Sequence, residues 1–186
     1  MNFTETKLKG CFILEPTVFE DERGYFFEAF NDQKFEQIVG AKPAFVQDNQ
    51  SQSQYGVVRG LHMQSGDHGQ AKLVRVLEGK VLDVAVDVRP GSATYGQYEA
   101  VELSAENKRQ LYVPRGFLHG FSVLSENAVF FYKCDNHYHK VAEDGVHPLD
   151  KTISIDWQVP REDMILSKKD EEAQSFTAFK DKNGIG

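Results

Sequence analysis

The stretch Lys-Val-Leu-Asp-Val-Ala-Val-Asp-Val at positions 80–88 decides the fold class, because its residues alternate with a period of two. Asp83 and Asp87 fall on one face, and the other face carries Leu82, Val84, Val86 and Val88. This alternation is typical of a β-strand that has one face in the core and one toward solvent. We therefore expect a half-buried strand at 80–88.

Short strands are predicted on both sides of this stretch. Residues 71–79 read as a strand that ends in a tight turn at Glu78-Gly79, so 71–88 is expected to form a hairpin. Turn-forming clusters at 89–92 and 114–116 separate further segments of the same kind. The additional predicted strands are 11–15, 24–30, 44–50, 56–64, 97–103, 109–113, 118–124 and 127–134.

Helical signals are few. Residues 32–39 are predicted to form a helix that Asn31 or Asp32 caps and Gly40 ends, and one more short helix is expected at 160–164 or 168–174. About ten short strands with turns every 8–12 residues indicate an all-β sandwich or jelly roll with short peripheral helices. We expect a single domain over 1–186 with a frayed tail from about residue 176.

The bulk properties exclude several functional classes. The chain has 186 residues and a net charge of −7, with an isoelectric point near 5.4. This charge argues against non-specific binding to nucleic acid or to an anionic membrane. No apolar run is long enough to cross a membrane, no signal peptide is recognisable, and the two cysteines are too few for a disulfide framework. A cytoplasmic protein is therefore expected.

The segment 56–64 carries the first candidate site. Strict alternation would place Arg59 and His62 on opposite faces of a strand. Gly60 lies between them, and a glycine inside a strand often marks a bulge, which would turn both side chains toward one cavity. The alternative is an exposed arginine and a core histidine.

The segment 114–119, Pro-Arg-Gly-Phe-Leu-His, resembles the second conserved motif of cupins, whose histidine projects into the barrel. Many cupins hold a metal with this histidine and a His-x-His pair. Here Gln64 follows His62 at that spacing, and neither His68 nor Glu78 lies at a cupin ligand position. A single imidazole from each motif does not make a metal site unless carboxylates join them. We expect no metal.

Two further sets of side chains suit chemistry on a charged, oxygen-rich ligand. Tyr132 shares one face of a predicted strand with Phe130 and Cys134, so its phenol could enter the interior and act as an acid, although core packing is the alternative. Guanidinium groups suit phosphate oxygens, and amides suit the edge of a pyrimidine. The basic and amide residues of this set are Arg23, Gln47, Asn49, Arg59 and Lys72, and the alternative for each is an ordinary surface residue.

Several motifs, in order and with matching spacing, resemble those of the dTDP-4-dehydrorhamnose 3,5-epimerase family. Members of this family are sugar-nucleotide epimerases with the cupin fold, also called the double-stranded β-helix. The resemblance covers about residues 10–172. Its motifs are 21–28 (Asp-Glu-Arg-Gly-x-Phe-x-Glu), 47–53 (Gln-Asp-Asn-x-Ser-x-Ser), 59–64 (Arg-Gly-Leu-His-x-Gln), 70–75 (Gln-x-Lys-Leu-Val-Arg), 103–107 (Leu-Ser-x-Glu-Asn), 114–119, 132–133 (Tyr-Lys) and 165–170 (Ile-Leu-Ser-x-Lys-Asp).

The resemblance implies a role for each matching residue. His62 resembles the base that removes the protons at carbons 3 and 5 of a 4-keto sugar, and Asp170 the carboxylate that orients it. Tyr132 resembles the acid that returns a proton from the opposite face, and Lys72 the cation at the 4-keto oxygen. Tyr138 looks like the aromatic side chain that stacks on thymine. The other implied contacts with the nucleotide and the sugar are Arg23, Phe26, Glu28, Gln47, Asn49, Arg59, His119, Glu143 and Lys169.

The family further implies a jelly-roll homodimer without a metal or coenzyme, in which binding residues often cross between subunits. The expected reaction converts dTDP-4-dehydro-6-deoxy-D-glucose to dTDP-4-dehydro-L-rhamnose. Four alternatives stay open: an epimerase that inverts one carbon, a 3,4-ketoisomerase, a metal-dependent cupin oxygenase and a binding protein without catalysis.

Overall fold

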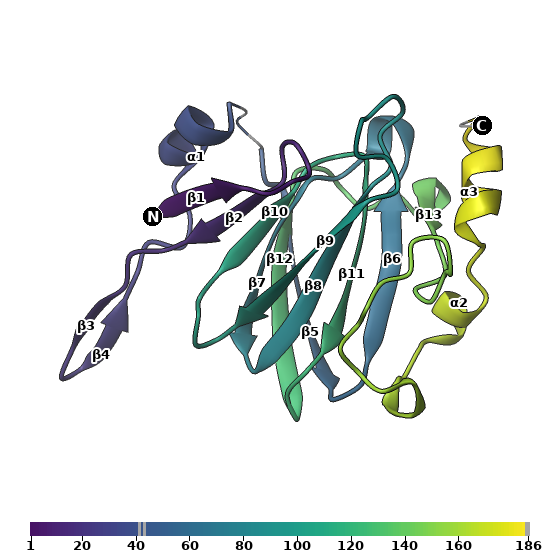
Figure 1. Cartoon of the computed structure of the whole chain (residues 1–186). Coiled ribbons are helices and arrows are strands. Elements are labelled where there is room, and N and C mark those ends of the chain that lie inside the picture. Colours follow the sequence, from purple (N-terminus) through teal and green to yellow (C-terminus); the bar gives the residue numbers. More distant parts are fainter. Residues whose placement is uncertain (41, 43, 185–186) are drawn as a thin grey trace.

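Two antiparallel β-sheets face each other and enclose the interior of the molecule (Figure 1). The computed structural model describes residues 1–40, 42 and 44–184. The six-stranded sheet has the order β1 (Asn2–Glu5), β2 (Phe12–Glu15), β10 (Gln110–Val113), β7 (Lys72–Glu78), β12 (Asn127–Cys134) and β5 (Gln47–Gln54). The five-stranded sheet has the order β13 (Glu143–Gly145), β6 (Val58–Gln64), β11 (Phe117–Val123), β8 (Lys80–Asp87) and β9 (Tyr98–Ser104). The predicted all-β class with short peripheral helices is confirmed.

Strand β8, which matches the alternating stretch 80–88, is buried on both faces. The prediction that only one face of this strand is buried is therefore wrong. Residues 81–87 of β8 are all buried. Val81 and Ala85 belong to the core between the sheets, whereas Leu82 and Val84 pack on the outer face against the C-terminal segment. Asp83 and Asp87 lie on the face of Val81 and Ala85, because side chains alternate along a strand. The aspartates therefore point into the molecule and not to solvent.

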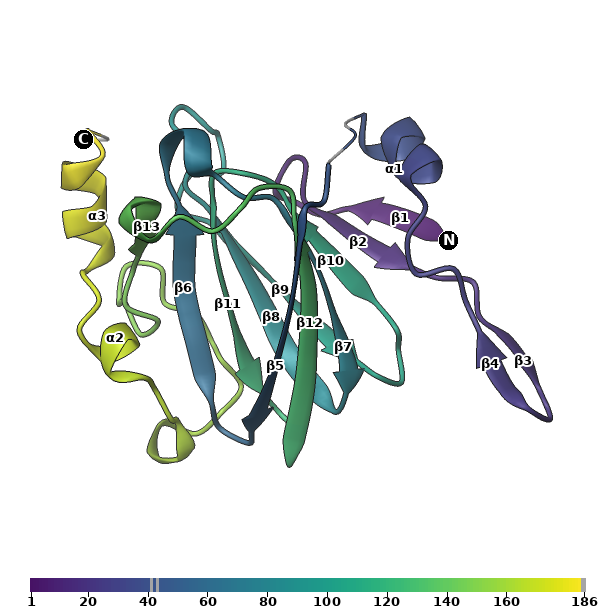
Figure 2. The same cartoon turned by 180° about the vertical axis from the view of Figure 1, so that it is seen from behind.

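The C-terminal segment covers the outer face of the five-stranded sheet (Figure 2). Trp157, which is 1% exposed, and Ile153 pack there together with Phe176 and Phe179. Phe176 and Phe179 belong to helix α3 (Phe176–Lys182), whose N-cap is Ser175. The frayed tail expected from about residue 176 is therefore wrong up to residue 184, because two phenylalanines anchor this helix to the sheet. Residues 185–186 lie outside the described residues.

Helix α1 (Asp32–Val39) packs on the outer face of the six-stranded sheet. The Asn31 side chain accepts a hydrogen bond from the Lys34 amide, and Gly40 ends the helix with a φ of 73°, as predicted. Phe35 is 0% exposed and packs against Phe12, Leu14 and Tyr112, among others.

The remaining predicted elements are present with shifted bounds. Both ranges offered for the second predicted helix are helical: the first holds a 3₁₀ turn at Arg161–Asp163 and the second holds helix α2 (Lys168–Glu171). Two further 3₁₀ turns lie at Gly66–His68 and Lys140–Ala142. The strand expected at 44–50 begins at Gln47, and the strand expected at 24–30 is limited to β4 (Gly24–Phe26). Strands β1, β3 (Phe19–Asp21) and β13 were not predicted, because they have only three or four residues and no residue of any of them is fully buried, so they show little alternation.

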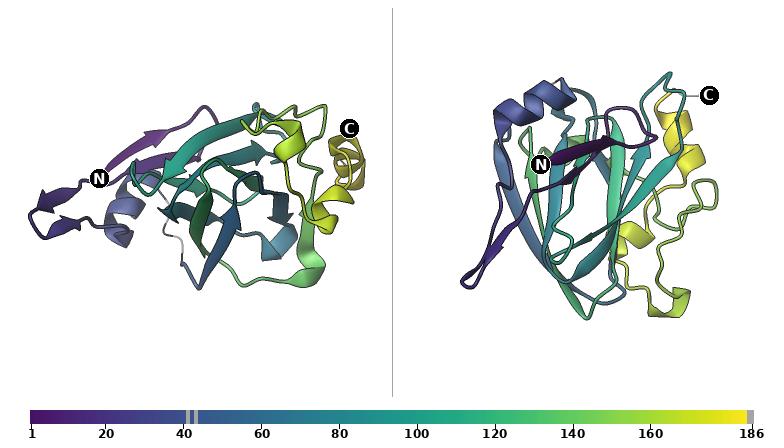
Figure 3. Two further views of the ribbon diagram at one scale, coloured as in Figure 1. Left: turned by 90° about the horizontal axis from the view of Figure 1, so that it is seen from below. Right: turned by 60° about the vertical axis from the view of Figure 1, so that its left-hand side comes forward.

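The hairpin of β3 and β4 extends away from both sheets (Figure 3). Three of its aromatic side chains, Phe19, Tyr25 and Phe26, are 64%, 61% and 69% exposed. No helix among the described residues is long and apolar enough to cross a membrane.

We predict that Asp87→Asn lowers the free energy of unfolding most at neutral pH. Burial raises the pKa of Asp87, but hydrogen bonds from Arg89, Ser92 and Thr94 outweigh it and bring the pKa to about 2. The carboxylate is therefore expected to contribute about 2 kcal/mol of stability above the ordinary aspartate pKa, and this contribution is lost as the pH falls toward 2.

Urea unfolding at about pH 7 and about pH 3 tests this expectation, since the difference between wild type and variant should shrink at the lower pH. An unchanged difference would show that Asp87 does not stabilise the fold through its charge.

Candidate active site

Two adjoining cavities lie between the sheets. The first has a volume of about 310 Å³ and the second about 320 Å³. Both are lined by His62 of β6, Lys72 of β7 and Tyr132 of β12, so these three side chains stand where the cavities meet. The first cavity is also lined by Gln47, Asn49, Met63, Gln64, Gln70, Cys134, Tyr138 and Glu143. The second is also lined by Ser51, Arg59, His119, Gly120, Phe121, Phe130, Ser167, Lys169 and Asp170.

A bulge in β6 turns Arg59 and His62 toward the same cavity. His62 pairs with His119 and Arg59 with Phe121, so β6 has one residue more than β11 over this interval. Gly60 lies in the bulge with a φ of 115°. A Cβ atom at Gly60 would lie 2.6 Å from the Gly120 Cα, which is too close for any side chain. Glycine avoids this clash because it has no Cβ atom. The predicted effect of Gly60 is confirmed, since both side chains line the second cavity.

His62 is held by a buried carboxylate. Its Nε2 lies 2.5 Å from Asp170 Oδ1, and the Asp170 side chain is 3% exposed. The Ser167 hydroxyl donates to the other carboxylate oxygen at 2.8 Å and also caps α2. Burial raises the pKa of Asp170, but the hydrogen bonds with His62 and Ser167 outweigh burial and hold this pKa below its ordinary value. An ionised Asp170 accepts a hydrogen bond from Nε2–H of His62. This leaves Nδ1 of the ring free to accept a proton.

Lys72 and Tyr132 lie across the cavities from His62, on the other sheet. The Lys72 ammonium is 5.9 Å from the centre of the Tyr132 ring. Burial raises the pKa of Tyr132, so its phenol is protonated at neutral pH and can act as an acid. Burial also lowers the pKa of Lys72, while the charges of Cys134, Asp83 and Glu143 oppose that shift. The site thus pairs an imidazole on one wall with a phenol and an ammonium on the other.

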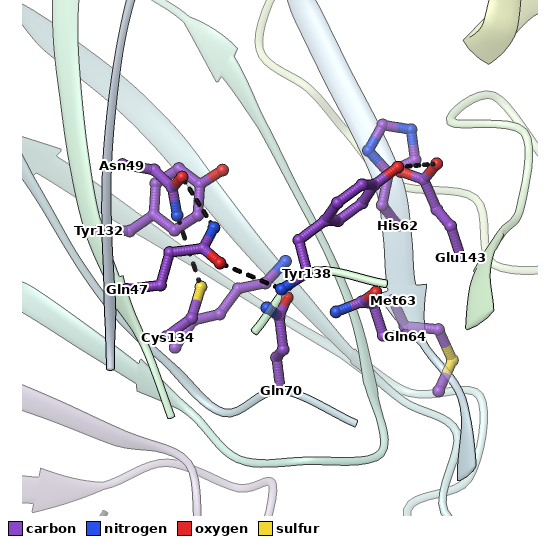
Figure 4. Close-up of a pocket in the computed structure, with 11 residues that line it drawn as sticks. Gln47, Asn49, His62, Met63, Gln64, Gln70, Tyr132, Cys134, Tyr138 and Glu143 are labelled. Carbon is purple, nitrogen blue, oxygen red and sulfur yellow. Dashed lines mark hydrogen bonds between the residues drawn. The ribbon is translucent and has the colours of Figure 1, made fainter. Parts of the chain in front are cut away.

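Amide side chains form one wall of the first cavity (Figure 4). The Gln47 amide donates to Asn49 Oδ1 at 3.0 Å and accepts from the Tyr138 backbone amide at 3.0 Å. Asn49 donates in turn to Cys134 Sγ at 3.7 Å. This chain of hydrogen bonds fixes the two amides beside the aromatic ring of Tyr138.

A second polar group closes the opposite side of the first cavity. The Tyr138 hydroxyl donates to Glu143 Oε2 at 3.2 Å (Figure 4). Lys169 of α2 forms an ion pair with Glu143 at 2.5 Å. The aromatic ring, the carboxylate and the ammonium, which come from separate parts of the chain, therefore meet at the rim.

Three predicted contacts lie outside both cavities. Arg23 and Phe26 belong to the protruding hairpin, where Arg23 pairs with Asp21. Glu28 follows the hairpin and pairs with Lys34 of α1. The structure therefore gathers the other predicted residues at the cavities, but it does not bring these three to them in the same chain.

Several lining residues were not predicted, although some carried a signal. Ser51 continues the alternation of Gln47 and Asn49 along β5. Ser167 stands three residues before Asp170, the spacing of a helix cap whose side chain also reaches the carboxylate. Gln64 and Gln70 belong to the family-like motifs at 59–64 and 70–75, but the resemblance implies no role for them. Asp83, which contacts His119, was expected at the surface.

No group of three or more potential metal ligands occurs among the described side chains. His62 and His119 each take a carboxylate partner of their own, Asp170 and Asp83. The donor set therefore favours proton transfer, and the expectation of a site without metal stays a prediction.

The comparisons with known proteins agree with this arrangement. A family model described as dTDP-4-dehydrorhamnose 3,5-epimerase matches residues 5–178. A relative from Shigella flexneri with the name dTDP-4-dehydrorhamnose 3,5-epimerase is 52% identical over 176 residues, which are 95% of this chain and 96% of the relative.

Solved structures extend the agreement to the fold. The crystal structure of dTDP-4-dehydrorhamnose 3,5-epimerase from Elizabethkingia anophelis matches with a TM-score of 0.93 and 60% identity, covering 96% of this chain and 97% of the other. The structure of dTDP-6-deoxy-D-glucose-3,5-epimerase from Legionella pneumophila in complex with dTDP-4-keto-L-rhamnose matches with a TM-score of 0.90 and 48% identity, covering 95% and 93%. The predicted cupin jelly roll and the resemblance drawn from the motifs are confirmed. This chain belongs to the dTDP-4-dehydrorhamnose 3,5-epimerase family.

Proposed function

We propose that the protein inverts carbons 3 and 5 of dTDP-4-dehydro-6-deoxy-D-glucose and so forms dTDP-4-dehydro-L-rhamnose for dTDP-L-rhamnose biosynthesis. The observation that carries this proposal is the pairing of His62 with the buried Asp170 at the junction of the two cavities, opposite Tyr132. A base on one wall and an acid on the other are what inversion at carbon requires.

The first step is removal of a proton next to the ketone. His62 Nδ1 takes the proton, and Asp170 stabilises the imidazolium that forms. The negative charge moves to the 4-keto oxygen as an enolate. Lys72 is the cation assigned to that oxygen, where it stabilises charge that is present in the transition state and not in the substrate.

The second step returns a proton from the opposite face. Tyr132 lies on the other sheet from His62, and its raised pKa keeps the phenol protonated until it is needed. The phenolate then takes a proton from solvent and the His62 imidazolium gives its proton to solvent, so both groups return to their starting states. Two inversions repeat the same steps at carbons 3 and 5, and no bond to a cofactor is required.

The nucleotide would occupy the first cavity. Tyr138 offers a ring for stacking, and the Gln47 and Asn49 amides offer donors and acceptors for a pyrimidine edge. Arg59 and Lys169 line the second cavity and supply positive charge for the diphosphate.

We further infer a homodimer in which the hairpin of one subunit completes the site of the other. Arg23, Phe26 and Glu28 carry family-like motifs yet lie away from the cavities of their own chain. The exposed aromatic side chains of the hairpin are typical of an interface that a second subunit covers. A cytoplasmic location is part of the same proposal and agrees with two free cysteines.

We predict that deuterium is incorporated at carbons 3 and 5 when the protein acts on dTDP-4-keto-6-deoxyglucose in heavy water. NMR spectra of the sugar nucleotide measure this incorporation. His62→Ala should lower this exchange at least about 100-fold, because the base is lost, while thymidine diphosphate binding is retained. His147→Ala is the matched control, since His147 lies outside both cavities.

Label at one carbon only would favour an epimerase that inverts a single centre. Exchange that survives in the His62 variant would show that the base is another residue. Bound iron or manganese with oxygen consumption would favour a cupin oxygenase, and tight binding without exchange would favour a binding protein.

Tyr132→Phe is predicted to separate the two steps. His62 would still remove the proton and exchange it with solvent, so recovered substrate should carry deuterium without inversion. Epimerised product should form at least about 100-fold more slowly, because the acid is missing. Product formed at the wild-type rate would exclude Tyr132 as the acid.

The lent hairpin can be tested by mixing two defective variants. Arg23→Ala and His62→Ala are each expected to be slow, yet subunits refolded together would place one intact site in each mixed dimer. Roughly a quarter of the wild-type sites should return for random pairing. Activity that stays at the sum of the separate variants would place both residues in the same chain's site.

A further inference from the structure

A second histidine–carboxylate pair borders the second cavity. His119 of β11 lines this cavity, and its Nε2 lies 2.9 and 3.1 Å from the two carboxylate oxygens of Asp83 on β8. The side chains are 7% and 0% exposed. His62–Asp170 and His119–Asp83 therefore both contribute to the lining of one cavity, although only the first pair has a role in the proposed reaction.

Asp83 differs from the other buried aspartate of its strand in how it is satisfied. Asp87, also 0% exposed, accepts hydrogen bonds from Arg89, Ser92 and Thr94. Among the described residues, Asp83 oxygens have one hydrogen-bonding partner atom, His119 Nε2. Loss of this contact would be costly in free energy, because no other protein group would replace the water that a buried carboxylate has given up.

This geometry fixes the proton on His119. A bare Nε2 would direct its lone pair at two carboxylate oxygens in a site without bulk water, which is repulsive. Nε2 therefore carries a hydrogen and donates it to Asp83. Nδ1 makes no hydrogen bond within the described part of the chain, so it is the ring nitrogen left for a ligand.

We propose that Asp83 is a positioning residue that holds His119 through Nε2–H and so presents Nδ1 to the sugar in the second cavity. The proposal rests on the proposed function for the identity of the sugar nucleotide. Asp83 does not touch the substrate. It fixes the rotation and the tautomer of the imidazole, so the sugar meets a nitrogen of one defined kind on the same wall as His62 and on the opposite sheet from Lys72.

Asp83 could also act on Lys72, because its charge favours the protonated form of that buried amine. The two routes make different predictions for a variant that lacks His119. If Asp83 acts through His119, its removal changes nothing more once the imidazole is gone. If it acts through Lys72, or only through stability, its removal costs the same in either background.

The first test reads the tautomer directly in the free protein. Nitrogen-15 spectra of histidine-labelled wild type should show the hydrogen of His119 on Nε2, with the signals assigned by their absence in His119→Gln. Asp83→Asn should shift part of the population to the Nδ1–H form, because an asparagine can either accept from Nε2 or donate to it. A wild-type spectrum with a bare Nε2 would overturn the proposal.

The second test measures turnover in a double-mutant cycle. Asp83→Asn should lower the rate of deuterium exchange about 10- to 100-fold while thymidine diphosphate binding stays within about twofold, because the nucleotide lies in the first cavity. The same substitution in a His119→Ala background should have no further effect. A loss of equal size in that background would overturn the proposal.

Asp87→Asn is the matched control, since it removes a buried carboxylate from the same face of the same strand. It should lower stability without lowering exchange per folded molecule. If Asp83→Asn fails to fold, the wild-type spectrum still decides the tautomer. If wild type shows Nε2–H but never exchanges deuterium, the proposed function fails and the role of Asp83 in holding His119 stands.

Discussion

Charged groups between two packed sheets must find partners, and this constraint organises the whole molecule. The interior of a β-sandwich has little water, so an unpaired carboxylate or ammonium there destabilises the fold by several kcal/mol. Asp87 meets the requirement with Arg89 and two hydroxyl groups, which makes it a structural group. Asp83 and Asp170 meet it with histidines, which leaves one nitrogen of each ring for chemistry.

The same constraint explains why the two cavities differ. One wall of the first carries neutral amides, of which Gln47 and Asn49 hydrogen-bond to each other, so an uncharged base can replace water beside them at small cost. The second gathers Arg59, Lys72 and Lys169 together with Asp170 and His119. A ligand with a neutral end and an anionic, oxygen-rich end fits this gradient. The three side chains at the junction are those assigned as the base, the acid and the cation that stabilises the enolate.

Local sequence patterns predicted most strands, because alternation depends only on the residues of the strand itself. They could not tell what covers each face. Residues 80–88 alternate like a half-exposed strand, yet Trp157 and Phe176, which are distant in sequence, cover one face, and the opposite sheet covers the other. Helix α3 escaped prediction for the same reason, since its two phenylalanines signal burial only once the sheet beside them is known.

The residues of the candidate site were predicted better than the burial of the strand faces, because several motifs in the family order identify the site residues as a set. Their placement confirms that His62, Lys72, Tyr132 and Asp170 meet, but their roles stay predictions. Arg23, Phe26 and Glu28 lie elsewhere, since a motif records what a site uses and not which subunit supplies it. Asp83 was missed because an aspartate that alternates with valine looks like a surface residue.

The close approach of Gly60 and Gly120 has a consequence for how this site can change. Added side chains at either position would meet backbone at 2.6 or 2.5 Å, so the distance between β6 and β11 is set by the main chain. The spacing of His62 and His119 is inherited from that distance. Diversification of substrate range must therefore proceed through replaceable wall residues such as Met63 and Ser51, while the frame that sets the reacting groups stays the same. Libraries for altered sugar specificity would best leave both glycines untouched.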